Sequence, residues 1–266
     1  MNTQVASQDL QKKITSFLED LARETDQARK SEAMQKYLDF AGRFHKYSPS
    51  NIFLIMLTRP DATQVAGFQT WRKLGRYVRK HEKGIAILAP LTQKDDPDDV
   101  NSTKVLRGFR VVFVFDVAQT DGKPLPPTPE WKSPEKNAEL TVKLIRYAES
   151  KGISVTVKEL PGEIQGISKG GAIEFSPDAG TKTLIHEIAH EIMHRTEGAT
   201  SDPSLREMEA EAAAYSVARH FEIGNLNSSN YIVLNGSTSD SIKISLSKIQ
   251  EAVTEIIGAI EISMDE

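Results

Sequence analysis

The sequence predicts an α+β fold divided into two domains. Apolar residues recur at helical spacing near both ends of the chain, and segments rich in β-branched and aromatic residues, such as residues 109–115, lie between them. With 266 residues, of which 39% are hydrophobic, the chain can bury one large core or two modest ones. Residues 120–131 contain four prolines and are the best linker candidate. We therefore expect one domain over 1–119, a linker over 120–134 and a second domain over 135–266.

The first domain is expected to be a small α+β domain with a short antiparallel sheet. Residues 8–30 and 32–46 each show an amphipathic helical pattern, and shorter helices are expected over 51–57 and 67–74. Strands are expected at Tyr77–Val78, over 85–88 and over 109–115, with an exposed acidic loop at 95–99.

The second domain is expected to alternate helices and strands before it ends in helices. A helix is predicted over 135–151, and strands over 153–160 and 171–175 lead into a helix that ends near Gly198. Asp202 and Pro203 are suitable for starting another helix, which would end near Phe221. A last helix over about 240–262 carries an apolar stripe typical of a core, although a dimer seam would have the same pattern, so the oligomeric state is not predicted.

Composition restricts the classes of site and of partner. The chain has no cysteine, so any zinc must be held by histidines and carboxylates. The N-terminus has no apolar signal region and the longest apolar run, 52–57, is too short for a membrane span, so we expect a soluble, cytoplasmic protein with no membrane partner. Residues 1–116 contain 19 Lys and Arg against 14 Asp and Glu, and the remainder contains 14 against 23. The first part is therefore compatible with a polyanionic partner.

The most informative motif is HEIAHEIMH, which contains an HExxH sequence formed by His186, Glu187 and His190. Two imidazoles at positions i and i+4 share one face of a helix and can bind one metal ion, while the glutamate can act on a water held by that ion. His194 extends the series, but it lies about 12 Å from His186 along a continuous helix, too far to be a third ligand. Surface histidines on an amphipathic helix are the alternative interpretation.

A catalytic zinc site needs a third protein ligand. The segment LREMEAEAAAY offers Glu207, Glu209 and Glu211 about 20 residues after the motif. Glu207, Glu211 and Tyr215 share one helical face, whereas Glu209 points elsewhere. Glu211 is our first choice for the third ligand and Glu207 the second, and a solvated row of glutamates is the alternative.

These residues predict zinc-dependent hydrolysis of peptide bonds. Zn²⁺ would polarise the carbonyl and activate water, and Glu187 would take a proton and deliver it to the leaving amine. A strand edge such as 171–175 could hold an extended peptide substrate by backbone pairing. Tyr215 could assist, although a buried core tyrosine is the more ordinary interpretation.

A basic, aromatic segment predicts single-stranded nucleic acid binding in the first domain. Cationic side chains can contact phosphates and aromatic rings can stack on bases. The candidate residues are Trp71, Arg72, Lys73, Arg76, Tyr77, Arg79, Lys80 and Lys83. A basic turn around a buried tryptophan is the alternative, and Phe53, Phe68 and Phe109 are expected to be core residues.

The run from Asn51 to Pro90, with its WRKLGRYVRKHEKG segment, resembles the N-terminal domain of ArdC-type antirestriction proteins over about residues 30–117. This resemblance implies a single-stranded-DNA-binding domain that precedes a zincin-like metallopeptidase domain. The sequence departs from the family pattern at His81, where the turn often carries glycine.

The second half, with TLIHEIAHEIMH and EMEAEAAAY, is similar to the ImmA/IrrE and SprT-like metallopeptidases over about residues 140–222. The match of Glu209, Glu211, Ala212 and Tyr215 to their E-x-E-A-x-x-aromatic block implies Glu211 as third ligand. The two resemblances together imply a zinc endopeptidase coupled to single-stranded-DNA binding, from a mobile element and used in antirestriction or in processing DNA-bound proteins.

Two other functions fit the same residues. The protein could be a DNA-binding antirestriction shield whose metal site is structural, in which case Glu187→Gln would leave its biological activity intact. It could instead be a regulatory protease that cleaves a repressor, in which case the first domain would recognise protein and its binding would depend weakly on salt.

Overall fold

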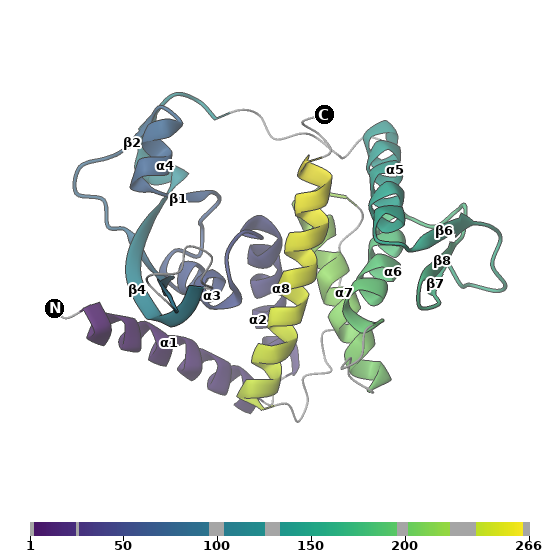
Figure 1. Cartoon of the computed structure of the whole chain (residues 1–266), viewed down its shortest axis with the longest axis horizontal. Helices are drawn as coiled ribbons and strands as arrows, with labels where there is room; N and C mark the ends of the chain where they lie inside the picture. The colour runs from purple at the N-terminus through teal and green to yellow at the C-terminus, as the bar shows by residue number, and fades with distance from the viewer. Residues whose placement is uncertain are drawn as a thin grey trace. The chain divides into compact units, whose positions relative to one another are not determined.

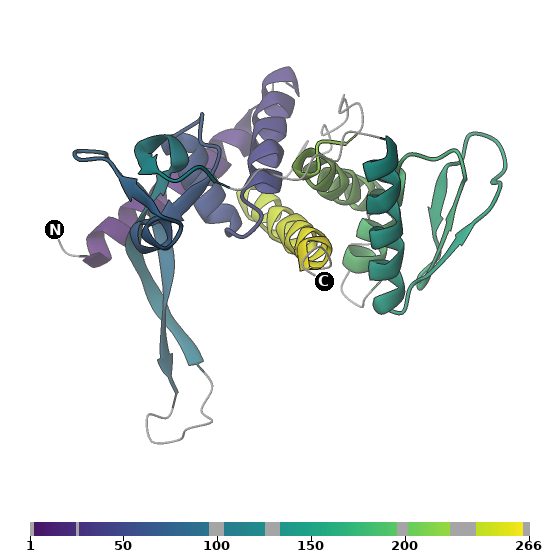
Figure 2. The same cartoon turned by 90° about the horizontal axis from the view of Figure 1, so that it is seen from above.

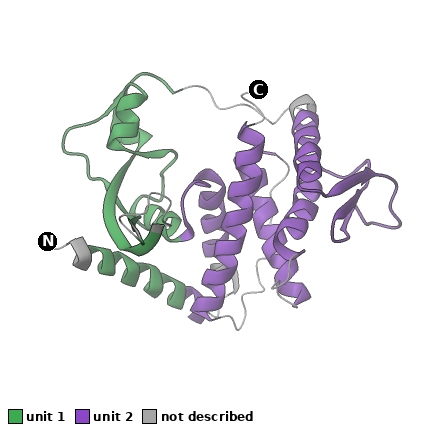
Figure 3. Cartoon of the chain, viewed as in Figure 1, with its two compact units in different colours: residues 1–20, 50–126 green, residues 21–49, 127–266 purple. Residues whose placement is uncertain are grey.

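The computed structural model describes residues 3–24, 27–95, 104–125, 134–195, 202–223 and 238–262. It is an α+β fold, as the sequence predicts, and it separates into two compact units (Figures 1 and 3). Unit 1 comprises residues 1–20 and 50–126, and unit 2 comprises residues 21–49 and 127–266. In the described part of the chain, every helix is too short or too polar to span a lipid bilayer.

Unit 1 is built on an antiparallel sheet of three strands. β4 (Lys104–Asp116) lies between β1 (Val65–Gly67) and β3 (Ile85–Lys94), and Figure 2 shows β3 and β4 as a long two-stranded ribbon. Ile85 and Ile87 are buried, as is Val114 opposite Ile85, because the side chains of directly opposed residues share one face of a sheet.

Short elements complete unit 1. β2 (Arg76–Val78) pairs with β5 (Thr120–Gly122), and the 3₁₀ turn η1 (Val117–Gln119) joins β4 to β5. The first residues of the predicted linker therefore form a strand, whereas residues 126–133 lie outside the described residues, as do 96–99 of the predicted acidic loop.

Helices α1 (Thr3–Arg23), α3 (Pro49–Thr58) and α4 (Phe68–Lys73) match predicted helices of the first domain. α3 is buried over most of its length, and the side chain of Asn51 both donates to and accepts from the backbone of Leu88, at 2.9 and 2.8 Å. This pair of hydrogen bonds joins α3 to β3, because an asparagine amide can satisfy a backbone carbonyl and a backbone N–H together.

His81 lies in the turn between β2 and β3 and has a φ of 69°, in the left-handed region. Glycine reaches this region without a steric penalty, and histidine is one of the few other residue types that occupy it at all often. The position at which the sequence departs from the family pattern is therefore one where the backbone favours glycine.

The described residues of unit 2 form five helices and a second small sheet. The helices are α2 (Gln27–Arg43), α5 (Pro134–Ser150), α6 (Thr181–His194), α7 (Pro203–His220) and α8 (Ser239–Ile262). In the sheet, β8 (Ala172–Phe175) runs parallel to β6 (Ser154–Val157) and antiparallel to β7 (Gly166–Ser168).

Residues 21–49 belong to unit 2, whereas the sequence placed them in the first domain. The reason is the packing of α2 on α7. A Cβ at Gly42 would come within 2.2 Å of the Ser216 carbonyl oxygen, so the two helices approach as closely as glycine permits. Tyr215, buried between them, donates a hydrogen bond to Asp39 at 2.8 Å, which is a structural role. An amphipathic pattern identifies a helix but does not identify its packing partner.

Candidate metal centre

The HExxH motif lies on α6, as predicted, and its two histidines face the same point. The Nε2 atoms of His186 and His190 are 3.1 Å apart. α6 begins after Gly180, whose extended conformation makes it the N-cap, and the next residues present Leu184, Ile185 and Ile188 to the core. This buried stripe fixes the rotation of α6 and leaves the two imidazoles in a cleft.

Glu207 completes the group of possible ligands. Its two carboxylate oxygens lie 3.4 Å from His186 Nε2 and 3.3 Å from His190 Nε2, and the three donor atoms lie within 4.8 Å of one another. Around a tetrahedral zinc ion with bonds of about 2.1 Å, neighbouring donors are roughly 3.4 Å apart. The residues present therefore fit a divalent metal ion.

Glu211, the first choice for the third ligand, lies on a different side of His186. Its Oε2 atom is 3.4 Å from Nδ1 of His186, while its Oε1 atom contacts the ammonium group of Lys182. These two contacts hold the pKa of Glu211 below its usual value against the opposing effect of burial. Glu211 therefore contacts the ring nitrogen of His186 that does not face His190, and it can orient the imidazole. Glu207 has the position expected of a ligand.

The neighbouring carboxylates also change the protonation of the histidines. Burial alone would lower the pKa of His186, but its contact with Glu211 and the charges of Glu187 and Glu207 raise it overall. Burial and the neighbouring His186 lower the pKa of His190 to about 4. His190 is therefore neutral at physiological pH, the form in which an imidazole binds a metal ion.

Glu187 is 7% exposed and lies beside β7. A Cβ at Gly166 would come within 2.8 Å of its Cγ and Oε1 atoms, so the strand and the carboxylate are in close contact. Burial raises the pKa of Glu187 above its usual value, with His186 and the Ser168 backbone opposing the shift. A carboxylate with a raised pKa is a better proton acceptor at neutral pH.

The cleft has a volume of about 680 Å³ and is lined by residues of β7 on one side and of α6 and α7 on the other. Gly166, Ser168 and Gly170 contribute from β7 and the turn after it, and His190 and Glu207 contribute from α6 and α7. The edge of a strand beside the histidines could accept an extended polypeptide by backbone pairing.

The sequence interpretation missed Glu191, which connects this strand to the metal helix. Glu191 is 2% exposed and accepts hydrogen bonds from Ser168 Oγ at 2.7 Å, from Gly170 N at 2.8 Å and from Gly171 N at 2.6 Å. These bonds hold the turn between β7 and β8 against α6. Glu191 lies three residues after Ile188 and seven after Leu184, on the buried face of α6, and this helical spacing was the available signal.

The predicted nucleic-acid-binding residues of unit 1 divide into buried, tethered and exposed groups. Trp71 is 2% exposed and its Nε1 atom donates to the Phe115 carbonyl at 2.8 Å, so its ring is a core element and its predicted stacking role is corrected. The guanidinium of Arg76 donates to Thr120 and Lys123, and that of Arg79 pairs with Glu82 and the Ala118 carbonyl.

The remaining candidates are exposed. They are Arg72, Lys73, Tyr77, Lys80 and Lys83. Phe53 is buried as expected, but Phe68 is 46% exposed and Phe109 is 36% exposed, so the prediction that both belong to the core is wrong. Phe109 and Phe113, opposite Pro90 and Ala86 in the register, share one face of the β3–β4 ribbon. These aromatic residues were missed because strand alternation alone does not say which face is covered.

Comparisons with known proteins agree with the resemblance found in the sequence. The family model for the N-terminal domain of anti-restriction factor ArdC matches residues 4–117. An uncharacterized protein of Bacillus anthracis is 26% identical over 88% of this chain, and the chain spans about half (49%) of that relative's length.

Two solved structures of the antirestriction ArdC protein from the R388 plasmid are also similar. The metal-free structure has 19% sequence identity and a TM-score of 0.46, with 82% of this chain and 84% of that chain covered. The Mn(II)-bound structure has 16% identity and a TM-score of 0.44, with 84% and 97% covered. The family-model match is the stronger result, and residues 4–117 of this chain therefore belong to the family of ArdC N-terminal domains.

Proposed function

We propose that this chain is an antirestriction protein of the ArdC type, in which unit 1 binds single-stranded DNA and unit 2 is a zinc-dependent endopeptidase. The observation that carries the proposal is the convergence of His186 Nε2, His190 Nε2 and the Glu207 carboxylate in a cleft that also contains Glu187.

The peptidase part follows from the roles that these residues can take. His186, His190 and Glu207 would hold Zn²⁺, which when bound supplies a Lewis acid for the scissile carbonyl. Glu187 is not in the group of ligands, and its buried carboxylate is available to accept a proton from the attacking water. It would then deliver that proton to the leaving amine. Glu211 and Lys182 would orient His186 through its Nδ1 atom.

The DNA-binding part rests on exposed groups of unit 1. Tyr77 is 60% exposed and Phe113 is 56% exposed, and with Phe109 they offer rings on which bases can stack. Exposed lysines and arginines of the 72–83 segment would contact phosphates. Binding to one DNA strand would raise the local concentration of proteins on that strand for the peptidase.

The test compares four forms of the full chain loaded with Zn²⁺: the parent, Glu187→Gln, Glu207→Gln and Glu211→Gln. Zinc content is measured by elemental analysis, and cleavage of fluorescently labelled casein is measured with and without circular single-stranded DNA. We expect Glu187→Gln to keep zinc and lose cleavage, and Glu207→Gln to lose both. Glu211→Gln is the matched control and should keep zinc.

The same variants test the biological role by transfer of plasmid DNA into a restricting host. Loss of protection in Glu187→Gln would support the peptidase. Full protection by this variant would contradict it and would leave DNA binding alone as the antirestriction activity. Loss of zinc in Glu211→Gln, with retention in Glu207→Gln, would reverse the assignment of the third ligand.

A further inference from the structure

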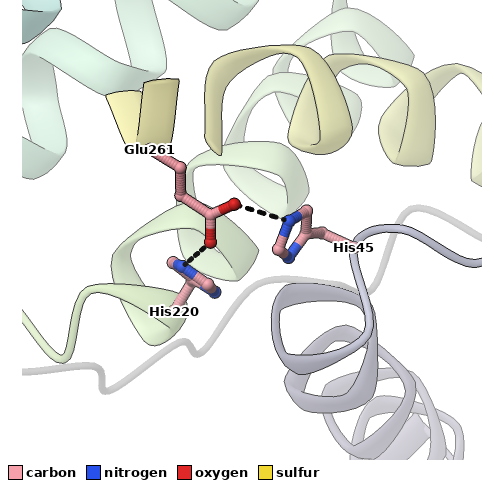
Figure 4. A group of neighbouring side chains, drawn as sticks. All are labelled: His45, His220 and Glu261. Carbon is pink, nitrogen blue, oxygen red and sulfur yellow. Dashed lines mark ion pairs between the residues drawn. The ribbon is translucent and has the colours of Figure 1, made fainter. Parts of the chain in front are cut away.

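A second group of metal-binding side chains lies in unit 2, outside the cleft. His45 lies in the turn after α2, His220 is the last residue of α7, and Glu261 lies near the end of α8 (Figure 4). One ligand atom from each residue lies within 4.8 Å of those from the others. The group joins the ends of three helices, and the proposed peptidase does not use it.

His45 has the most unusual environment of the three residues, because its imidazole is buried with few polar contacts. Its side chain is 7% exposed, and within the described residues neither ring nitrogen makes a well-aligned hydrogen bond. The Oε2 atom of Glu261 lies 3.5 Å from its Nε2 atom. Buried polar atoms in folded proteins almost always have a partner, and an ion is one explanation for an exception.

His220 has the arrangement of a metal ligand. Its Nδ1 atom lies 3.1 Å from the Gly42 carbonyl, so Nδ1–H donates to that oxygen and the lone pair is on Nε2. Nε2 faces Glu261 Oε1 at 3.5 Å. Metal-binding histidines usually donate their other N–H to a carbonyl or carboxylate, because this fixes the tautomer and the ring orientation.

The backbone around His45 is held in place by groups other than the three side chains. The His45 carbonyl accepts hydrogen bonds from Gln250 Nε2 at 3.0 Å and from Thr254 Oγ1 at 2.6 Å, both on α8. The turn is therefore fixed to α8 whatever the imidazole binds. Burial and the nearby His220 lower the pKa of His45 to about 4, so the ring is neutral at physiological pH.

We propose that His45, His220 and Glu261 form a second site for a divalent transition-metal ion of the Zn²⁺ type, which clamps the ends of α2, α7 and α8. Two imidazoles and one carboxylate are a common donor set for such ions. The two His–Glu distances of 3.5 Å are close to the roughly 3.4 Å between neighbouring donors of a tetrahedral zinc site.

Lys46 provides the competing explanation. Its ammonium group lies 3.1 Å from Glu261 Oε2, and its side chain is 71% exposed. In this explanation the carboxylate belongs to a surface ion pair and His45 is an unpaired core residue. Such an ion pair is weak, and the exposed lysine can move into solvent. The ion pair would therefore reduce the affinity of the site for a metal ion without preventing binding.

The experiment uses the full chain with both cleft histidines replaced, His186→Ala and His190→Ala, so that zinc in the cleft does not contribute. Zinc is measured by elemental analysis after equilibrium dialysis at micromolar concentrations, and circular dichroism checks the fold. We expect about one zinc per chain. Glu261→Gln in this background should weaken binding at least about tenfold, whereas Glu251→Gln, an exposed carboxylate on the same helix, should not change it.

A second pair of variants separates the metal site from the ion pair. Lys46→Met should strengthen zinc binding about two- to fivefold, since it removes a cation that competes for Glu261. Lys243→Met, an exposed lysine on α8, is the matched control and should have no effect. Zinc should also raise the melting temperature of the background protein, and it should not do so in Glu261→Gln.

The proposal is overturned if the folded background protein binds no zinc, or if Glu261→Gln binds it as tightly as the background does. Should the background variant fail to fold, the parent gives the same answer: two zinc ions per chain, and one in Glu261→Gln. Retention of casein cleavage in Glu261→Gln would keep this result separate from the test of the cleft.

Discussion

Glu209 Oε2 lies 3.0 Å from Nε2 of His194, and Glu209 has no exposed surface. The pair joins α7 to α6 beside the candidate metal centre. It is one of the contacts that pack α7 on α6, the same packing that brings Glu207 to His186 and His190. The contact with His194 keeps the pKa of Glu209 low, although burial favours the neutral carboxyl.

We predict that Glu209→Ala destabilises the protein by about 1–3 kcal/mol, because the substitution leaves Nε2 of the buried His194 without its hydrogen-bond partner. Glu207→Ala is the control: that side chain is 67% exposed, so its loss should change the metal-free stability by less than about 0.5 kcal/mol. Urea unfolding with a metal chelator present measures both. Equal stability of the two variants would contradict the structural role of the buried pair.

The sequence identified the two histidines of this site but left the third ligand open between Glu211 and Glu207, for a physical reason. His186 and His190 meet because residues four apart always share a helical face, which is a local property. The position of Glu207 or Glu211 depends on the packing of α7 on α6, to which the contact between His194 and Glu209 contributes. The sequence interpretation had assigned these two residues no joint role.

In unit 1, too, the sequence predicted local structure better than it predicted packing. Apolar spacing predicted the helices and strands, but it did not predict which aromatic rings are buried and which are exposed. Trp71 is buried, and its indole N–H donates a hydrogen bond to the Phe115 carbonyl. Phe113 is exposed on the β3–β4 ribbon. Both residue types have apolar bodies, so composition alone does not distinguish a stacking ring from a core ring.

Gly166 should be required for the position of the proposed catalytic base. In Gly166→Ala the new methyl group would lie 2.8 Å from the Glu187 side chain and 3.0 Å from Thr183 Cγ2, so Glu187 must move. We expect cleavage of casein to fall at least about tenfold while zinc content stays unchanged, since misplaced catalytic groups lose much of their effect. Gly258→Ala, which has open space, should leave cleavage intact. Zinc loss in Gly166→Ala would contradict this explanation.

His81→Gly should stabilise unit 1. The φ of 69° places His81 in a region that glycine adopts freely, and the strain of a side chain there is about 1–2 kcal/mol. Glycine also gains more freedom in the unfolded chain, so the net gain should be no more than about 1 kcal/mol. Differential scanning calorimetry would measure it, and a lower melting temperature would show that the His81 side chain contributes contacts of its own.

Tyr147 should make the stability of unit 2 fall at alkaline pH. Its hydroxyl donates to Glu255 Oε1 at 2.9 Å, and burial together with Glu255 raises its pKa above 10. Above pH 10 the unfolded chain loses the phenolic proton and the folded chain keeps it, so stability decreases as pH rises. We expect Tyr147→Phe to cost about 1 kcal/mol at neutral pH and to show a shallower alkaline decrease. Urea unfolding between pH 8 and about 11 would compare the two, and parallel curves would contradict the assignment.

Replacing Trp71 should lower stability, whereas replacing Phe109 should lower DNA affinity, although both rings belong to unit 1. Trp71→Ala empties a buried position and removes the hydrogen bond to Phe115, so we expect a loss of stability of about 3–5 kcal/mol. Phe109→Ala removes a partly exposed ring, so stability should change little.

Single-stranded DNA affinity should instead weaken in Phe109→Ala by about 1–3 kcal/mol, the usual value for one base stacked on an aromatic ring. Val157→Ala, an exposed apolar residue of unit 2, is the control and should bind DNA like the parent. Fluorescence anisotropy with a labelled oligonucleotide at several salt concentrations gives the affinity and its salt slope. Phe109 carries no charge, so the slope should match that of the parent while the affinity falls. An unchanged affinity would exclude this face of the ribbon from the DNA-binding surface.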